Sequence, residues 1–161
     1  MEVRLARPSD GEAIRTIYNL EVTTSTVTFD LVPRTAEEQA AWLEARSGAL
    51  AVVVAEEDHE ILGFASLSPY RHRPAYATTV EDSVYVARGA QGRGVGSAVL
   101  GSVLELAGVH GFHAVMARVV GGHDASIGLH RRHGFEVVGV EREVGRKFGR
   151  WLDVAVMERL L

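Results

Sequence analysis

The sequence of 161 residues contains no cysteine, a single lysine and no long apolar run. Without cysteine the chain has no disulfide, no thiolate metal site and no cysteine nucleophile that could carry an acyl group between two substrates. Lysine-specific chemistry is restricted to Lys147. No apolar stretch approaches the roughly 18 residues of a membrane span, and residues 1–4 (MEVR) are charged, so we expect a cytoplasmic protein with no membrane partner.

Acidic and basic side chains are unevenly distributed along the chain. The 17 basic and 21 acidic residues give a formal net charge of −4. Residues 1–80 carry 7 basic and 12 acidic side chains, whereas residues 81–161 carry 10 and 9. An anionic ligand is therefore expected in the second half. Because no basic run is present, no nucleic-acid partner is expected.

Hydrophobic periodicity predicts one α/β domain over residues 1–161, with the order β-α-α-β-β-β-α-β-α-β-β. The predicted strands cover about residues 2–6, 51–55, 61–67, 78–86, 113–119, 135–144 and 150–160. Two early helices begin at capping boxes, Ser9 to Glu12 and Thr35 to Glu38, and two later helices cover 94–110 and 124–133. Residues 23–29 (TTSTVTF) are a poor helix interior and predict a loop, either beside a ligand or simply solvated.

Residues 83–97 (SVYVARGAQGRGVGS) predict a strand that runs into a glycine-rich turn and then a helix. Glycines let a ligand approach the backbone, and free N–H groups at a helix N-terminus bind phosphate groups. Arg88 and Arg93 add charges that can contact the same anion. The segment lacks the Gly-Lys-Ser/Thr of a P-loop, and Ser97 replaces the last glycine of a dinucleotide-binding Gly-x-Gly-x-x-Gly. A nucleotide triphosphatase and a dehydrogenase are therefore not expected.

Gln91, Gly94 and Gly96 match the Gln/Arg-x-x-Gly-x-Gly/Ala signature of the GNAT superfamily of N-acetyltransferases, in the expected strand–turn–helix context. The chain resembles this family over nearly its whole length, most closely the phosphinothricin and methionine sulfoximine acetyltransferase branch. The other matching segments are 17–19, 28–30, 79–86, 126–130, 133–135 and 144–153. The resemblance implies a GNAT-type domain with a mixed, mostly antiparallel sheet of about seven strands and four helices.

The resemblance further implies acetyl-CoA as cosubstrate and no metal. The implied cofactor contacts are Val84, Tyr85 and Val86 for the pantetheine arm, Gln91, Gly92, Arg93, Gly94, Val95, Gly96 and Ser97 for the pyrophosphate, and His123 and Ser126 on the second cofactor helix. A strand bulge near Tyr85 is implied to turn a backbone N–H toward the thioester carbonyl, as an oxyanion hole does. His123 stands where the family usually has Asn, so Asp124 is expected to cap this helix instead.

Amine acetylation needs a neutral amine, and a carboxylate is the expected base. Glu81 matches the family's proposed base; a solvated strand residue is the alternative interpretation, and Glu21 is a second candidate. His130 occupies the position from which the family protonates or stabilises the departing thiolate, or it is a structural, hydrogen-bonded histidine. His130-x-x-His133 has no third ligand nearby in sequence, which argues against a metal site.

The acceptor is predicted from the turn before the Glu81 strand. Arg71, His72 and Arg73 suit an anionic group such as a carboxylate or phosphinate, or they form a solvated basic turn. The other predicted substrate contacts are Phe29, Tyr76, Glu81, Asp82 and Ser83. The resemblance favours a small amino-acid-like amine, and it implies a homodimer through the loop of residues 147–151.

Three functions stay open at this point. The first is direct acetyl transfer to an amino-acid analogue within a ternary complex. The second keeps the fold but uses a peptide N-terminus, polyamine or aminoglycoside as acceptor. The third is a non-catalytic acyl-CoA-binding module.

Overall fold

Seven strands of the computed structural model, which describes all 161 residues, form one sheet in the order β1-β2-β3-β4-β5-β7-β6. The strands are β1 (Glu2–Leu5), β2 (Val52–Glu57), β3 (Glu60–Pro69), β4 (Thr79–Val86), β5 (Ala114–Val120), β6 (Glu136–Lys147) and β7 (Arg150–Leu160). The helices are α1 (Gly11–Thr24), α2 (Ala36–Glu44), α3 (Val95–Val109) and α4 (Asp124–Arg132). Only β4 and β5 pair in parallel. The predicted order of elements and the mixed, mostly antiparallel sheet are confirmed.

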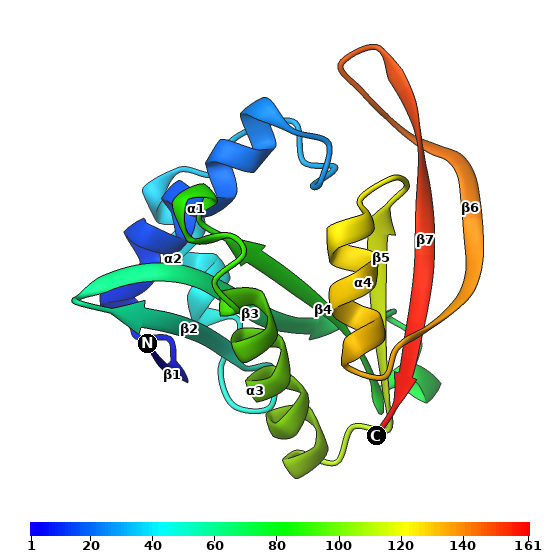
Figure 1. Cartoon of the computed structure of the whole chain (residues 1–161). Coiled ribbons are helices and arrows are strands. Elements are labelled where there is room, and N and C mark those ends of the chain that lie inside the picture. Colours follow the sequence, from blue (N-terminus) through cyan, green and yellow to red (C-terminus); the bar gives the residue numbers. More distant parts are fainter.

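Helices cover both faces of the sheet (Figure 1). On one face α1 packs Ile14, Ile17 and Val22 against Val54 and Phe64 of β2 and β3. On the other face α3 contributes a row of buried residues to the larger core, and α4 lies beside it (Figure 1). The β6–β7 hairpin, drawn in orange and red, extends past the end of the remaining strands (Figure 1). None of the helices is both long and apolar enough to cross a membrane.

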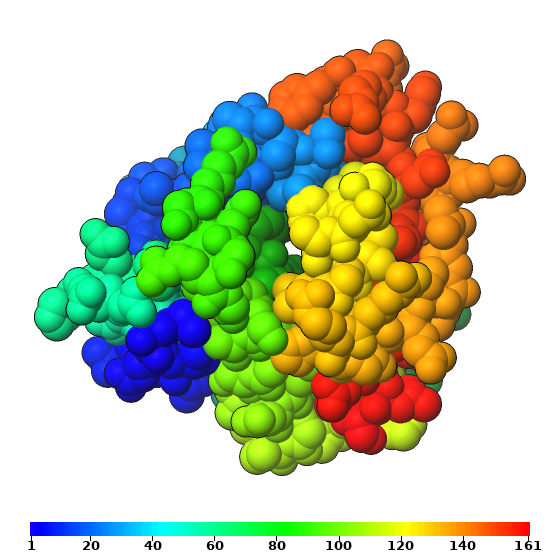
Figure 2. Space-filling model, in the orientation of Figure 1, coloured from blue at the N-terminus to red at the C-terminus, as the bar shows by residue number.

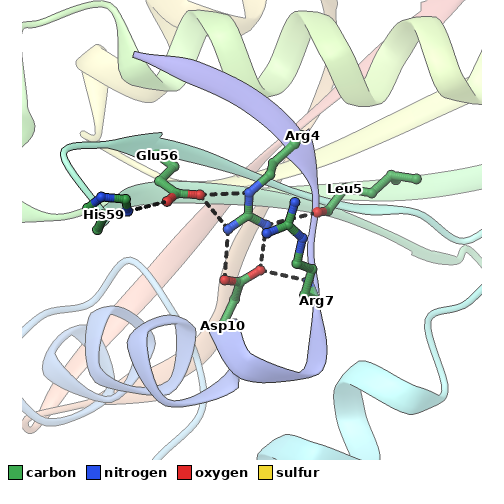
Figure 3. A network of polar contacts seen from close by, with 6 residues as sticks. All are labelled: Arg4, Leu5, Arg7, Asp10, Glu56 and His59. Atoms are coloured by element: carbon green, nitrogen blue, oxygen red, sulfur yellow. Dashed lines mark hydrogen bonds and ion pairs between the residues drawn. The ribbon is translucent and has the colours of Figure 1, made fainter.

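The start of α1 differs from the prediction. The capping box expected from Ser9 is absent, and Asp10 lies at the N-cap without capping the helix. Instead, the Asp10 carboxylate accepts from the Arg7 backbone N–H at 2.6 Å and pairs with Arg4, which also binds Glu56 of β2 (Figure 3). Two charge-assisted bonds from Arg4 outweigh one local cap. This network fastens β1 to the neighbouring strand and to α1.

Threonines at the end of α1 also behave differently from the prediction. Thr23 and Thr24 belong to the helix, because their hydroxyls donate to the carbonyls of Asn19 and Leu20 one turn earlier. The loop therefore begins at Ser25. The second capping box is confirmed, with Thr35 Oγ1 accepting from the Glu38 N–H at 3.1 Å.

The sheet splits between β4 and β5. Their parallel pairing covers only residues 79–81 of β4 and 114–116 of β5. Beyond it, β4 stays paired with β3 through Val86, and β5 stays paired with β7 through Val120. The register of β3 against β4 is unbroken, so the bulge expected near Tyr85 is absent. The opening arises because the two strands diverge.

Candidate active site

The space between the diverging strands is a cleft of about 940 Å³. It lies between the turn before α3 and the helix α4, where the molecular surface is hollowed (Figure 2). The predicted site residues that line it are Phe29, Glu81, Asp82, Ser83, Val84, Tyr85, Val86, Gln91, Gly92, Gly94, Val95, Gly96, Ser97, His123, Ser126 and His130. Residues from both halves of the chain thus meet in one cavity.

The turn before α3 is shaped for an anionic group. Gly92 and Gly94 have φ of 76° and 83°, a region that side chains rarely adopt, and a Cβ at either would point into open space. No side chain caps α3, so its first N–H groups lack an intrahelical partner at the edge of the cleft. Free N–H groups and the positive end of the helix dipole together favour phosphate.

The two arginines of this turn are already paired. Arg93 forms an ion pair with Glu57 and does not line the cleft. Arg88 binds Glu21 at 3.0 Å and also contacts the Thr24 hydroxyl. Burial alone would raise the pKa of Glu21, but the pairing with Arg88 outweighs it and lowers the pKa. Glu21 is therefore a poor base near neutral pH. The backbone rather than either guanidinium therefore presents the donors of this turn.

The open edge of β4 offers hydrogen-bonding groups to a ligand. The Ala87 N–H donates to the Leu62 carbonyl of β3 at 2.8 Å. In an antiparallel pair every second residue bonds to the partner strand, so this bond shows which residues of β4 face β3 and which face away from it. Tyr85, two residues earlier, directs its N–H and C=O toward β3, whereas Val84 and Val86 direct theirs into the gap. The backbone donors available to a ligand in the gap are thus those of Val84 and Val86, on either side of Tyr85.

Glu81 lies on β4 at the narrow end of the cleft. Burial raises its pKa above the ordinary value of 4.5; the positive charge of Arg118 opposes this rise, and the nearby carboxylates of Asp82 and Glu141 add to it. A carboxylate with a raised pKa is a better proton acceptor near neutral pH. The position supports the interpretation of Glu81 as a base over that of a solvated strand residue.

Arg118 of β5 is a cleft residue that the sequence prediction missed. It points to the same face as Glu81 because Glu81 pairs with Met116, two residues before it. Its guanidinium binds Glu141 of β6 through two nitrogens. The available signal was a charged residue inside an otherwise apolar strand, AVMARVV.

His130 and Asp82 form a buried pair at the wall of the cleft. His130 Nε2 lies 3.0 Å from Asp82 Oδ2, and the two residues are 3% and 5% exposed. His130 Nδ1 lies 2.8 Å from the Ser126 carbonyl oxygen, which can only accept a hydrogen bond. Burial disfavours the charged ring, but Asp82 and the Ser126 carbonyl prevail and raise the pKa of His130. An acceptor thus lies at each ring nitrogen, which favours the protonated form of the ring.

His123 caps α4, although Asp124 was expected to do so. Its Nδ1 accepts from the Ser126 N–H at 3.3 Å, so the ring proton of the neutral form resides on Nε2. His123 itself therefore caps the helix, and its second ring nitrogen remains a donor in the cleft.

The loop after α1 forms part of the cleft wall through Val27, Thr28 and Phe29. Tyr18 donates to Asp30 and shares a hydrogen bond with Thr28. Lys147 Nζ, the only lysine nitrogen, donates to the Thr28 carbonyl at 2.9 Å, and burial lowers its pKa. The loop is thereby fastened both to α1 and to the end of β6.

The basic turn before β4 does not join this cleft. Arg71, His72 and Arg73 are exposed, and neither they nor Tyr76 line it. Arg71 stacks on Tyr70 and Tyr76, at 4.9 and 5.6 Å from the ring centres. These residues therefore do not line the cleft themselves, and their contact with the acceptor stays a prediction.

Comparison with known proteins agrees with this geometry. Residues 14–135 match the profile of the Acetyltransferase (GNAT) family. A phosphinothricin N-acetyltransferase of Streptomyces coelicolor is 44% identical over 100% of this chain and 96% of its own length. An L-methionine sulfoximine/L-methionine sulfone acetyltransferase of Pseudomonas paraeruginosa is 39% identical over 97% of this chain and 92% of its own.

A solved structure shows the same likeness in three dimensions. The phosphinothricin acetyltransferase of Sinorhizobium meliloti, determined in complex with AcCoA, superposes with a TM-score of 0.96 at 36% identity. The alignment covers 99% of this chain and 88% of that chain. The site and the comparisons together therefore define an acyltransferase fold with a split sheet and an anion-binding turn. The chain belongs to the GNAT family of acetyltransferases.

Proposed function

We propose that this enzyme transfers an acetyl group from acetyl-CoA directly to the amine of a small amino-acid-like substrate of the phosphinothricin or methionine sulfoximine type. The observation that carries the proposal is the position of Glu81, a half-buried carboxylate of raised pKa beside the free edge of β4. The names of the similar enzymes support the acceptor class.

The residues of the cleft fit acetyl-CoA. The uncapped start of α3, with Gly92 and Gly94, suits the pyrophosphate, and the edge groups of Val84 and Val86 suit the amides of the pantetheine arm. The His123 Nε2–H is a further donor in the cleft. When bound, acetyl-CoA supplies an activated thioester carbonyl.

Glu81 takes the proton that the acceptor amine loses when its nitrogen attacks the carbonyl carbon. A backbone N–H of Val84 or Val86 stabilises the negative charge that develops on the carbonyl oxygen. The carbon–sulfur bond then breaks, and the sulfur leaves as a thiolate. His130 lines the cleft, but Asp82 and the Ser126 carbonyl engage both of its ring nitrogens and Asp82 balances any charge on the ring, so His130 acts as a positioning residue that fixes Asp82 and the cleft wall.

A thiol-release assay with purified protein tests the proposal. Acetyl-CoA is supplied with L-methionine sulfone, L-methionine sulfoximine, phosphinothricin, a polyamine, an aminoglycoside and a peptide with a free N-terminus. The proposal requires turnover of at least one of the three amino-acid analogues above that of the cationic amines. Thiol release with none of the three would overturn the assignment of the acceptor, and binding of acetyl-CoA without any turnover would identify a non-catalytic module.

We also propose that the enzyme is a cytoplasmic homodimer. The support is a row of exposed apolar side chains on β6, β7 and their connection: Val138, Val140, Val144, Phe148 and Trp151. Large apolar side chains exposed together on one hairpin are typical of protein interfaces. Light scattering coupled to gel filtration should give twice the mass of the chain, and Trp151→Glu should shift it toward the monomer.

A further inference from the structure

A second, smaller cavity lies behind Tyr85, on the face of the sheet that α1 and α2 cover. Its volume is about 90 Å³, enough to hold several water molecules or a small polar group. It shares Tyr18, Ser83 and Tyr85 with the main cleft, so the two spaces adjoin. The remaining lining residues are Arg34, Trp42, Arg46, Phe64, Ser66 and Ser68, and no acidic side chain is among them.

Two guanidinium groups face this cavity without a carboxylate partner. Arg46 donates to the Trp42 carbonyl at 3.2 Å and to Ser68 Oγ at 3.0 Å, and its Nε is buried with no partner. Arg34 donates to Gln39 Oε1 at 3.1 Å. All of these acceptors are neutral. Burial and the charge of Arg34 lower the pKa of Arg46, so the two cations lie close enough to repel each other.

Aromatic stacking orients the two guanidiniums. Arg34 lies 3.8 Å from the centre of the Tyr18 ring, and the guanidiniums of Arg34 and Arg46 lie 4.7 and 4.3 Å from the centre of the Trp42 ring. Stacking occupies the faces of these planar groups and leaves their N–H edges for an acceptor in the plane. Two half-buried cations held close together favour an anion between them.

The cavity lies one strand away from the candidate base. Ser68 of β3 pairs with Glu81, and Ser66 pairs with Ser83. Glu81 and Ser83 point to the same face of β4, about 7 Å apart. In the main cleft, by contrast, the guanidinium nearest Glu81 is that of Arg118, which is already neutralised by Glu141.

We propose that Arg34 and Arg46 form an oxyanion subsite that takes the carboxylate of the amino-acid acceptor while its amine faces Glu81. The cavity is much smaller than the main cleft that it adjoins, about 90 against 940 Å³, so the carboxylate would enter it while the rest of the acceptor stays in the main cleft. The serine hydroxyls of Ser66, Ser68 and Ser83 supply further donors. This inference rests on the proposed function, and it makes the carboxylate a determinant of acceptor choice.

The test compares L-methionine sulfone with methylsulfonyl-propylamine, the same molecule without its carboxylate. Arg34→Met and Arg46→Met keep much of the side-chain stem, and Arg46→Lys keeps the charge but loses the forked geometry. Each variant should lower kcat/KM for the sulfone by roughly 10- to 100-fold, mainly through KM, and leave the value for the amine unchanged. Arg131→Met, on the exposed side of α4, is the matched control and should change neither value.

A binding measurement accompanies the kinetics and does not depend on turnover. Isotope-labelled formate should show line broadening in NMR spectra with the wild-type protein and with Arg131→Met, but not with Arg34→Met or Arg46→Met. Formate should also inhibit competitively against the sulfone. Thermal unfolding and calorimetric binding of acetyl-CoA verify that each variant is folded.

Equal loss with both acceptors, or no loss with either, would overturn the inference while the proposed function stands. Formate binding that needs both arginines, combined with no preference for the carboxylate-bearing acceptor, would identify a site for free carboxylates and overturn its assignment to the acceptor. A wild-type protein that releases no thiol with any amine would instead refute the proposed function itself.

Discussion

The ring of Phe29 occupies the space that a side chain at Gly145 would need. A Cβ built on Gly145 would lie 2.2 Å from Phe29 Cε2 and 2.5 Å from Cζ. Phe29 belongs to the loop that lines the cleft, and Gly145 lies on β6, so this contact places the far end of the hairpin against the acceptor side of the site. Together with the bond from Lys147 to the Thr28 carbonyl, it fixes where this loop lies.

Gly145→Ala should therefore displace Phe29. Because the end of the Phe29 ring is exposed and can swing aside, we expect a small loss in the free energy of unfolding, below about 1 kcal/mol, and a higher KM for the acceptor. Urea unfolding and steady-state kinetics measure the two effects. Gly139→Ala on the same strand is the control, because a Cβ there meets nothing within 4 Å. Equal effects of the two substitutions would show that the Phe29 contact is unimportant.

Glu81→Gln should lower kcat by about 100- to 10,000-fold while acetyl-CoA still binds. The folded protein raises the pKa of Glu81, and the base acts only when ionised. In the wild type, kcat/KM should therefore rise with pH through a pKa above 4.5, and Glu81→Gln should lose this dependence. Rates over a pH series and calorimetry with acetyl-CoA provide the measurement.

Glu21→Gln is the matched comparison, since Glu21 is the other carboxylate considered as base. Its pairing with Arg88 lowers its pKa, so we do not expect it to act as the base. Loss of a general base costs about 100- to 10,000-fold in rate, whereas Glu21→Gln should cost less than about tenfold. A larger loss for Glu21→Gln than for Glu81→Gln would exchange their roles.

Asp82→Asn should destabilise the protein in a pH-dependent manner. The pKa of His130 is raised in the folded state, so the stabilisation from the pair is complete below the ordinary imidazole pKa of 6.5 and is lost as pH rises through the raised value. We expect a loss of roughly 3 kcal/mol at about pH 6 and a smaller loss at about pH 9. Urea unfolding at both pH values measures it, with the exposed Asp124→Asn as control. The same loss at both values would refute an imidazolium at position 130.

His123→Ala should remove the cap of α4 and cost about 1 kcal/mol of stability, whereas His123→Asn should retain it. Thermal unfolding compares the two variants. If Asn destabilises the helix as much as Ala does, His123 stabilises α4 through its ring contacts and not through the cap.

Much of the fold could be predicted because its signals are local. Alternation, helical spacing and glycine-rich turns predicted all seven strands and four helices in order. The capping box at Thr35 was predicted correctly because both of its partners lie within four residues. The one at Ser9 was wrong because Ser9 lies inside a 3₁₀ turn, Pro8–Asp10, that precedes α1, and the Glu12 carboxylate pairs with Arg15 instead.

The site was predictable where the resemblance covered backbone motifs and less so where side chains from distant elements meet. The glycine turn, Glu81 and His130 all line the cleft as expected. Arg118 escaped notice because its place in the cleft depends on where β4 and β5 diverge. The roles of Arg34 and Arg46 likewise depend on α2 packing over β3, which no local pattern encodes.

Because β4 and β5 diverge, the two parts of the sheet are joined over only a short stretch. Only three residue pairs join the part built from β1–β4 to the part built from β5–β7. A cofactor arm paired along Val84 and Val86 would act as the missing strand between them. The rigidity of the enzyme would then depend on the concentration of acetyl-CoA. Amide exchange in β4 would slow as this concentration rises, and the melting temperature would increase with its logarithm.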